Sequence, residues 1–186
     1  MKEIEILVEV YSKKEFVNDV FKKFNYIGEK ETIDTYYYDP KRENLKPDKS
    51  LRLTEAFRLR KKDGKNYITY KIDNFDDNNI WLYSDEYETE VLDYNTIEKI
   101  IDKLELKPLI VINSKKKTYT HGDYEIVFEE VSGLGNFLEV EYCTDADIDI
   151  NIIKKKIQSF IDELGLDVSD ELNMGKPEMM LKKTRK

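Results

Sequence analysis

Cysteine and histidine are almost absent from this 186-residue chain, which contains one of each. The single cysteine, Cys143, excludes a disulfide framework within the chain and a zinc site built from several thiolates. The single histidine, His121, precedes Gly122 in a predicted turn, where we expect a solvated side chain. The sequence therefore offers no Ser–His–Asp or Cys–His arrangement for nucleophilic catalysis.

Long apolar runs are also missing. No stretch approaches 18 consecutive apolar residues, so no transmembrane helix is expected. Residues 1–10 alternate glutamate with aliphatic residues and lack the basic region and apolar run of a secretory signal peptide. We therefore expect a cytoplasmic protein with no membrane partner. Lys and Arg (31) are outnumbered by Asp and Glu (39), and this net charge of −8 argues against a nucleic-acid partner.

Glycine and proline are scarce as well, with 7 and 4 residues, and no stretch rich in them divides the chain. At roughly 100–200 residues per domain, this length predicts one domain that covers residues 1–186. Hydrophobic residues make up 40% of the chain and aromatic residues 12%, which excludes an intrinsically disordered protein. Charged residues reach 38%, well above the roughly 25% of ordinary soluble domains.

Alternation of apolar and polar residues predicts many β-strands. The predicted strands cover residues 3–10, 27–39, 50–62, 65–73, 80–92, 108–120, 122–131 and 136–143. Asp63-Gly64, between two of them, is a strong hairpin signal. Helical spacing predicts a helix that begins at Ser12, with Glu15 completing a capping box, and two more near 94–106 and 150–164. The order predicts an α+β fold with a largely antiparallel sheet.

Charges of one sign gather on single strand faces, because side chains in a strand alternate between its two faces. The sets are Glu3 and Glu5; Glu86, Glu88 and Glu90; Glu139 and Glu141; and Arg58, Arg60 and Lys62. One interpretation is a sheet that is covered by helices on its apolar face and exposes the charged face to water. The other is a closed sheet, whose segregated acids and bases would line a lumen and require ions and phosphates as partners.

Several motifs in order along the chain resemble those of one known family. The motifs are Glu3-Ile4-Glu5, Tyr36-Tyr37-Tyr38-Asp39, Phe57-Arg58-Leu59-Arg60, Thr69-Tyr70-Lys71, Glu86-Tyr87-Glu88-Thr89-Glu90, and a long run from Phe128 to Glu141. The last contains Gly133-Leu134-Gly135 followed by Phe137 and the two glutamates at 139 and 141. The chain thereby resembles the CYTH superfamily, which includes class IV adenylate cyclases, thiamine triphosphatases and inorganic triphosphatases.

This resemblance implies a closed antiparallel barrel of about eight strands with flanking helices, which forms a tunnel for triphosphates. It implies Mg2+ or Mn2+ as cofactor, in agreement with the preference of these ions for carboxylate oxygens. By resemblance, the metal-binding residues are Glu3, Glu5, Glu129, Glu139 and Glu141, and the phosphate-binding residues are Arg58, Arg60, Lys71 and Lys116. Possible additional site residues are Glu88, Glu90, Lys115 and Lys117. No catalytic residue is assigned.

The leading hypothesis is a metal-dependent enzyme that acts on a triphosphate such as ATP, thiamine triphosphate or tripolyphosphate. Both triphosphatase chemistry and class IV adenylate cyclase chemistry fit one such site. The alternative is a non-catalytic protein that binds nucleotide or polyphosphate, because Leu7 stands where the family signature has a lysine. A purely structural barrel is a third hypothesis. Lys176 and the basic end at 182–186 are two candidates for the missing positive charge.

Overall fold

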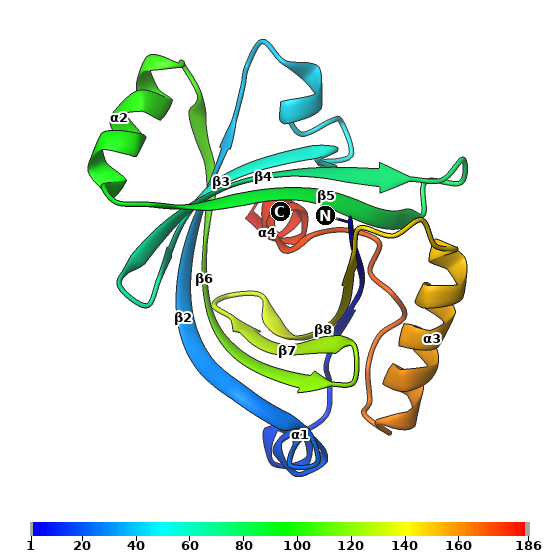
Figure 1. Cartoon of the computed structure of the whole chain (residues 1–186). Helices are drawn as coiled ribbons and strands as arrows, with labels where there is room; N and C mark the ends of the chain where they lie inside the picture. Colours follow the sequence, from blue (N-terminus) through cyan, green and yellow to red (C-terminus); the bar gives the residue numbers. More distant parts are fainter. Residues whose placement is uncertain (1, 185–186) are drawn as a thin grey trace.

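Eight antiparallel strands close into a barrel in the computed structural model, which describes residues 2–184 (Figure 1). The strands are β1 (Lys2–Glu9), β2 (Asn25–Tyr38), β3 (Glu55–Lys62), β4 (Lys65–Phe75), β5 (Trp81–Val91), β6 (Lys107–His121), β7 (Tyr124–Val131) and β8 (Gly135–Thr144). Their order around the barrel is β1-β5-β4-β3-β2-β6-β7-β8, and β8 pairs with β1 to close it. The predicted closed barrel is confirmed, and the open-sheet interpretation is wrong.

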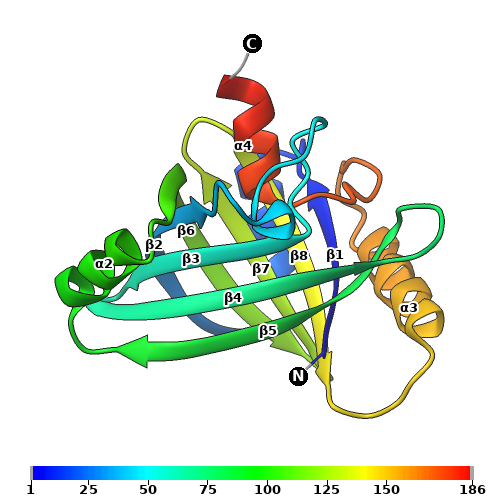
Figure 2. The same ribbon diagram turned by 90° about the horizontal axis from the view of Figure 1, so that it is seen from above.

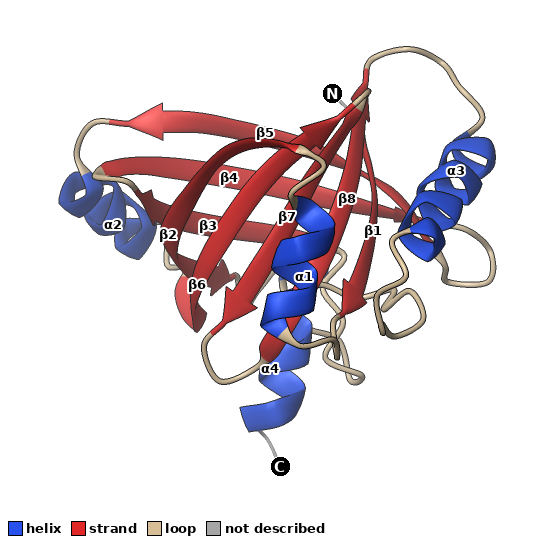
Figure 3. Ribbon diagram, turned by 90° about the horizontal axis from the view of Figure 1, so that it is seen from below, coloured by secondary structure: helices blue, strands red, loops and turns tan. Residues whose placement is uncertain are grey.

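Four helices accompany these strands within the described residues. They are α1 (Lys14–Phe21), α2 (Tyr94–Lys103), α3 (Ile150–Glu163) and α4 (Lys176–Thr184), and a short 3-10 helix, η1, covers Glu43–Leu45. Figure 3 shows α1 and α3 on the outside of the strands, whereas Figure 2 shows α4 at one end of the barrel. None of the helices in residues 2–184 is long and apolar enough to cross a membrane.

The main core lies outside the barrel wall, between the strands and two helices. Ile4, Ile6 and Val8 of β1 are at most 2% exposed and pack in one cluster with Phe21 of α1 and Ile157 of α3. Because neighbouring side chains of a strand point to opposite faces, burial of this set turns the alternate residues of β1 into the lumen. The hydrophobic effect of this outer core therefore fixes the inward direction of the charged face.

The hairpin predicted at Asp63-Gly64 is confirmed, and both residues have the positive φ angles, 52° and 74°, of a type I′ turn. The strand before it begins at Glu55 and not at the predicted residue 50. The reason is the Asp48 carboxylate, which accepts a hydrogen bond from the backbone N–H of Ser50 (2.7 Å). Such an aspartate-centred turn competes with the extended strand conformation.

The capping box predicted at Ser12 and Glu15 is wrong. Helix α1 begins at Lys14, and its N-cap residue, Lys13, makes no capping hydrogen bond with its side chain. The Ser12 hydroxyl instead accepts a hydrogen bond from the backbone N–H of Asp167 (2.7 Å). Ser12 therefore joins the end of β1 to the segment that follows α3, a tertiary role that replaces the local one.

A second apolar cluster fills the end of the barrel near α4. Its buried members are Leu7, Tyr36, Ile112, Val131 and Phe137. Leu172 and Met179, from the segment before α4 and from α4 itself, pack against them. The charged part of the lumen consequently lies between this apolar cluster and the opposite end of the barrel.

Candidate functional site

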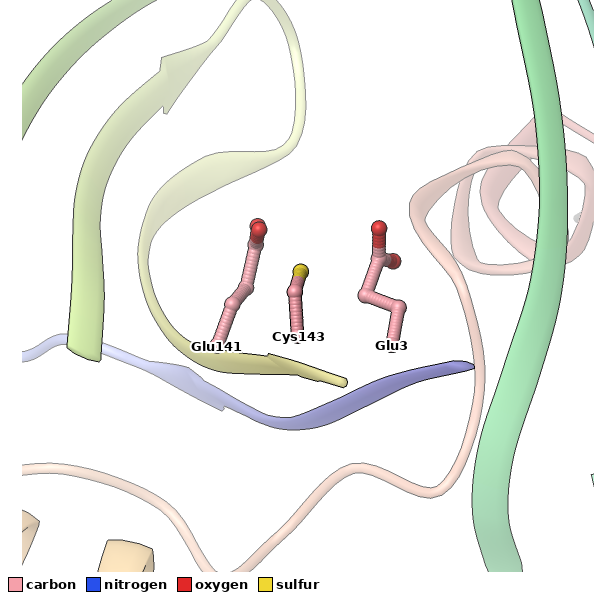
Figure 4. Close-up of side chains that lie close together, drawn as sticks. All are labelled: Glu3, Glu141 and Cys143. Carbon is pink, nitrogen blue, oxygen red and sulfur yellow. The ribbon is translucent and has the colours of Figure 1, made fainter. Parts of the chain in front are cut away.

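Glutamates of β1 and β8 point into the lumen from neighbouring strands. Glu5 lies directly opposite Glu141 in the strand register, and Glu3 lies opposite Cys143. Figure 4 shows Glu3, Glu141 and Cys143 pointing to the same side of these two strands. One carboxylate oxygen from each of Glu5, Glu139 and Glu141 lies within 4.8 Å of the others. Acids from opposite ends of the sequence thus form one cluster.

Lysines of β4 and β6 contact acids of the lumen. Lys71 of β4 donates hydrogen bonds to Glu3 (2.6 Å) and Glu5 (2.8 Å). Lys116 of β6 forms an ion pair with Glu129 of β7 (3.6 Å). The ammonium groups therefore neutralise carboxylates that are otherwise surrounded by other carboxylates.

The two predicted arginines of β3 have different surroundings. Arg60 donates two hydrogen bonds to Asp34 of β2, both of 2.7 Å, and forms a buried bidentate pair with it. Arg58 makes longer contacts, to Thr69 (3.2 Å) and to Glu88 (3.5 Å), and lies 3.9 Å from Asp34. Arg58 is thus the less firmly held guanidinium, and Glu88 lies beside it.

Charge pairing controls the protonation of these buried groups. Burial on its own would raise the pKa of Asp34, but its hydrogen bonds with Arg60 and the charges of Arg58 and Lys116 lower the pKa to about 2. Burial would lower the pKa of Arg58, but nearby Tyr36, Asp34 and Glu86 raise it. Both groups of this part of the lumen are consequently charged at neutral pH.

A further cation enters the lumen from α4. The ammonium of Lys176 donates a hydrogen bond to Glu139 (2.6 Å) and forms an ion pair with Glu129, and its side chain is only 11% exposed. Of the basic end, Lys182 donates to a methionine sulfur, and residues 185–186 lie outside the described residues. Between the two candidates for an added positive charge, the one found in the lumen is therefore Lys176.

The acid cluster divides into carboxyls with raised and lowered pKa values. Burial raises the pKa of Glu5 well above its usual value, in spite of Lys71, and the neighbouring glutamates raise it further. Burial and the nearby acids also raise the pKa of Glu141. Burial has the same tendency at Glu139, but Lys176 and other nearby groups lower its pKa well below the usual value. A cluster of this kind lacks enough positive charge for all its members.

Two of the predicted additional residues lie on the wrong side of the barrel wall. Lys115 pairs with Glu31 (2.6 Å) and Lys117 with Glu29 (3.7 Å), all four on the outer face of β6 and β2. The reason is strand alternation: because Lys116 points inward, its two neighbours point outward. The side chains of Lys115 and Lys117 therefore lie outside the lumen.

The end of the barrel away from α4 contains two lysines that sequence reasoning did not assign. Lys30 of β2 and Lys62 of β3 line a cavity there. Burial and the nearby charges of Lys30 and Arg60 lower the pKa of Lys62. The predicted Glu90 is exposed, pairs with Lys65 (2.8 Å) and lines neither cavity described for the lumen. Lys30 lies an even number of residues before Tyr36 on β2, so strand alternation places both side chains on the same face of the strand.

Two adjacent cavities lie in the lumen. The residues that line both are Arg58, Arg60, Lys71, Lys116 and Glu139, so these side chains lie between them. The cavity near α4 adds apolar and aromatic walls, including Trp81 and Ile112. The opposite cavity is lined by charged and polar side chains, with Val127 as its one purely aliphatic side chain among the described residues.

The acid cluster has the chemistry of a site for a hard divalent cation. Its donors are carboxylate oxygens on adjacent strands, the ligands that Mg2+ and Mn2+ prefer. One of them, Oε2 of Glu5, is buried and has no hydrogen-bond partner among the described residues. A buried carboxylate oxygen without a partner is costly, and a cation would satisfy it. The residues present therefore fit such an ion.

The comparisons with known proteins agree with this geometry. The model of the CYTH domain family matches residues 1–173, and the chain belongs to that family. The chain is 29% identical over 183 residues to MJ0240, an adenylate cyclase candidate of Methanocaldococcus jannaschii, covering 98% of this chain and 95% of that protein.

Solved structures show the same fold. PH1819 of Pyrococcus horikoshii OT3 superposes with a TM-score of 0.79 and 25% identity, covering 96% of this chain and 99% of that one. HpAC1 of Hippeastrum, an adenylyl cyclase candidate described as having a dominant triphosphatase activity, has a TM-score of 0.67. Its identity is 16%, and the match covers 98% of this chain and 96% of that one, so this likeness concerns the fold alone.

Proposed function

We propose that this protein is a metal-dependent enzyme that binds a triphosphate in its lumen and hydrolyses it. The observation that carries the proposal is the arrangement of charge: acids cluster on β1 and β8, while Arg58, Lys71 and Lys116 enter the lumen from β3, β4 and β6. Phosphoryl transfer depends mainly on positioning and on neutralising charge, and both kinds of residue supply these.

Glu5, Glu139 and Glu141 would hold the divalent cation, Mg2+ or Mn2+, with Glu3 and Glu129 beside them. A divalent ion bound there would lower the pKa of a water molecule and neutralise phosphate charge. The arginine and lysine side chains of the lumen would bind the phosphate oxygens and orient the triphosphate. Arg58 is best suited to this task, because its present contacts are longer than the two 2.7 Å bonds that hold Arg60 on Asp34.

Hydrolysis is favoured over cyclisation by the walls of the cavity away from α4. A cyclase must also hold the base of ATP, usually on an aromatic or apolar surface. In the described residues, the cavity away from α4 offers only Val127 for that purpose. Aromatic residues Tyr36 and Trp81 line the other cavity, beneath α4. The cyclase reaction is nevertheless the second candidate, because the relative MJ0240 carries that name.

Phosphorus NMR of reactions with tripolyphosphate, ATP and thiamine triphosphate, each with Mg2+ and with Mn2+, tests the proposal. We expect release of orthophosphate from tripolyphosphate, loss of the activity in Arg58→Met, and full activity in Lys115→Met, whose side chain is on the outer face. Cyclic AMP with pyrophosphate from ATP would instead establish the cyclase. Calorimetric binding without turnover would leave the non-catalytic alternative suggested by Leu7, and absence of binding would refute the triphosphate site.

A further inference from the structure

The chain that follows α3 returns along β1 and brings α4 to the end of the barrel. The backbone N–H of Ser169 donates to the carbonyl of Glu9, and that of Leu172 donates to the carbonyl of Leu7, both at 3.0 Å. Val168 forms an isolated antiparallel bridge with Val10. These bonds hold the start of α4, four residues after Leu172, beside the β1 position that carries Leu7.

Leu7 is an apolar residue among inward-facing charged residues. It lies directly opposite Glu139 in the β1–β8 register and is 3% exposed. The cation that contacts Glu139 comes from elsewhere: Lys176 of α4 reaches it over 2.6 Å. A positive charge beside Glu139 is therefore supplied by α4 and not by β1.

Lys176 also lines the same cavity as the candidate phosphate-binding residues. That cavity includes Arg58, Arg60, Lys71 and Lys116 as well as Lys176. The ammonium of Lys176 is now occupied by two carboxylates, Glu139 and Glu129. Both carboxylates belong to the acids that a divalent cation would compensate, and a cation bound there would release the ammonium for another anion.

We propose that Lys176 is a triphosphate-binding residue of this tunnel, supplied by α4 at the place where β1 carries Leu7. The proposal rests on the proposed function, since it assigns a residue to the same site. Lys176 lies beyond residues 1–173, the part that the family model matches. In the ligand-free protein Lys176 neutralises Glu129 and Glu139; with metal and triphosphate present, it contacts phosphate oxygens. Binding of the metal and of the triphosphate should accordingly strengthen each other.

Calorimetric titration with tripolyphosphate in the presence of Mn2+ tests this assignment. Lys176→Met should weaken the affinity by about tenfold to a hundredfold, the loss expected for one charged hydrogen-bonding partner. Lys183→Met is the matched control: it removes the same charge from an exposed position of the same helix and should bind as the wild type does. Lys176→Arg should recover most of the affinity.

A relocated lysine separates the binding role from a merely structural one. In the folded double variant Leu7→Lys, Lys176→Met, the ammonium returns to β1 beside Glu139, and most of the affinity should return with it. A structural tether of α4 would not be replaced in this way. Failure of the folded double variant to regain affinity would overturn the placement.

Two results separate this inference from the proposed function. Wild-type protein that does not bind tripolyphosphate refutes the proposed function itself. Wild-type protein that binds it, with Lys176→Met binding equally well, overturns the role of Lys176 alone. If Lys176→Met does not fold because Glu139 loses its ion pair with Lys176, the same comparison is made between Glu139→Gln and the double variant Glu139→Gln, Lys176→Met.

Discussion

The buried pair of Asp34 and Arg60 should be a stability element, while Arg58, two residues away, should be a binding element. Asp34 and Arg60 are 5% and 7% exposed and are joined by two hydrogen bonds of 2.7 Å. Arg60→Met leaves the Asp34 carboxylate buried with Arg58 as a distant partner at 3.9 Å. Breaking a buried pair from one side costs about 3–5 kcal/mol of unfolding free energy.

The pKa of Asp34 gives a second route to this magnitude. Its folded-state value of about 2 lies below the usual 3.8. A lowered pKa means that the stabilisation is present above pH 3.8 and is lost as the pH falls from 3.8 toward 2. The difference between these two pKa values corresponds to about 2 kcal/mol of unfolding free energy at neutral pH. We therefore expect Arg60→Met to cost about 2–5 kcal/mol at pH 7, with the deficit narrowing in acid.

Arg58→Met is the matched comparison, with the same substitution on the same strand. Its partners Glu86 and Glu88 have side chains that are 21% and 28% exposed, at 3.5 Å, so water can replace the arginine. We expect a stability change of about 0–1 kcal/mol. Its affinity for tripolyphosphate, in contrast, should fall by about tenfold to a hundredfold.

Urea unfolding at pH 7 and calorimetric titration with tripolyphosphate measure the two effects. Asp34→Asn together with Arg60→Met should be more stable than Arg60→Met alone, because the uncompensated charge is gone. A larger loss of stability in Arg58→Met than in Arg60→Met would refute the two assigned roles. So would a failure of Asp34→Asn to restore any of the stability lost in Arg60→Met.

Two other predictions follow from the buried acids. Mn2+ should raise the melting temperature, by a stabilisation of about 2.7 kcal/mol at roughly one hundred times its Kd. In thermal melts, Glu5→Gln should lose most of the Mn2+-induced rise in melting temperature, and Lys115→Met should keep it. An equal rise in both variants would contradict the proposed metal site. Burial raises the pKa of Glu178 from 4.5 to about 7, although Leu53 and Gly175 donate backbone hydrogen bonds to it. A raised carboxyl pKa means that this contribution is greatest below pH 4.5 and is lost as the pH rises to about 7, by about 3 kcal/mol. The melting temperature of Glu178→Gln should vary less with pH over this range. If its pH profile ran parallel to that of the wild type, the raised pKa would not belong to Glu178.

Strand alternation allowed much of the lumen to be predicted from sequence. Glu3 and Glu5 share a face because Ile4 and Ile6, on the other face, pack against the helices. The same parity rule, applied to Lys116, would have placed its two lysine neighbours outside the barrel. Nearness to Lys116 in the sequence does not place Lys115 and Lys117 in the site, because successive side chains of a strand point to opposite faces.

The partner of each arginine could not be predicted, because it depends on strand register. Arg58 and Arg60 share a face and a residue type, and the sequence does not distinguish them. In the barrel, Asp34 of β2 lies directly opposite Arg60 of β3, and Tyr36 lies opposite Arg58. A shift of two residues in this register would exchange their roles and leave Arg60 as the guanidinium with the weaker contacts.

The position of α4 follows from an unpaired edge that sequence alone did not reveal. β1 pairs with β5 only at Lys2 and Glu3, so the remaining edge of β1 needs other hydrogen-bond partners for its backbone. Residues 168–172 supply them, and α4 is thereby held at that end of the barrel. Because β5 leaves this edge of β1 free for that segment, α4 can place the Lys176 ammonium beside Glu139. The inward-facing position on β1 can then be occupied by the aliphatic Leu7. A residue missing from a strand motif is therefore weak evidence against function, since closure of the barrel determines which element supplies the charge.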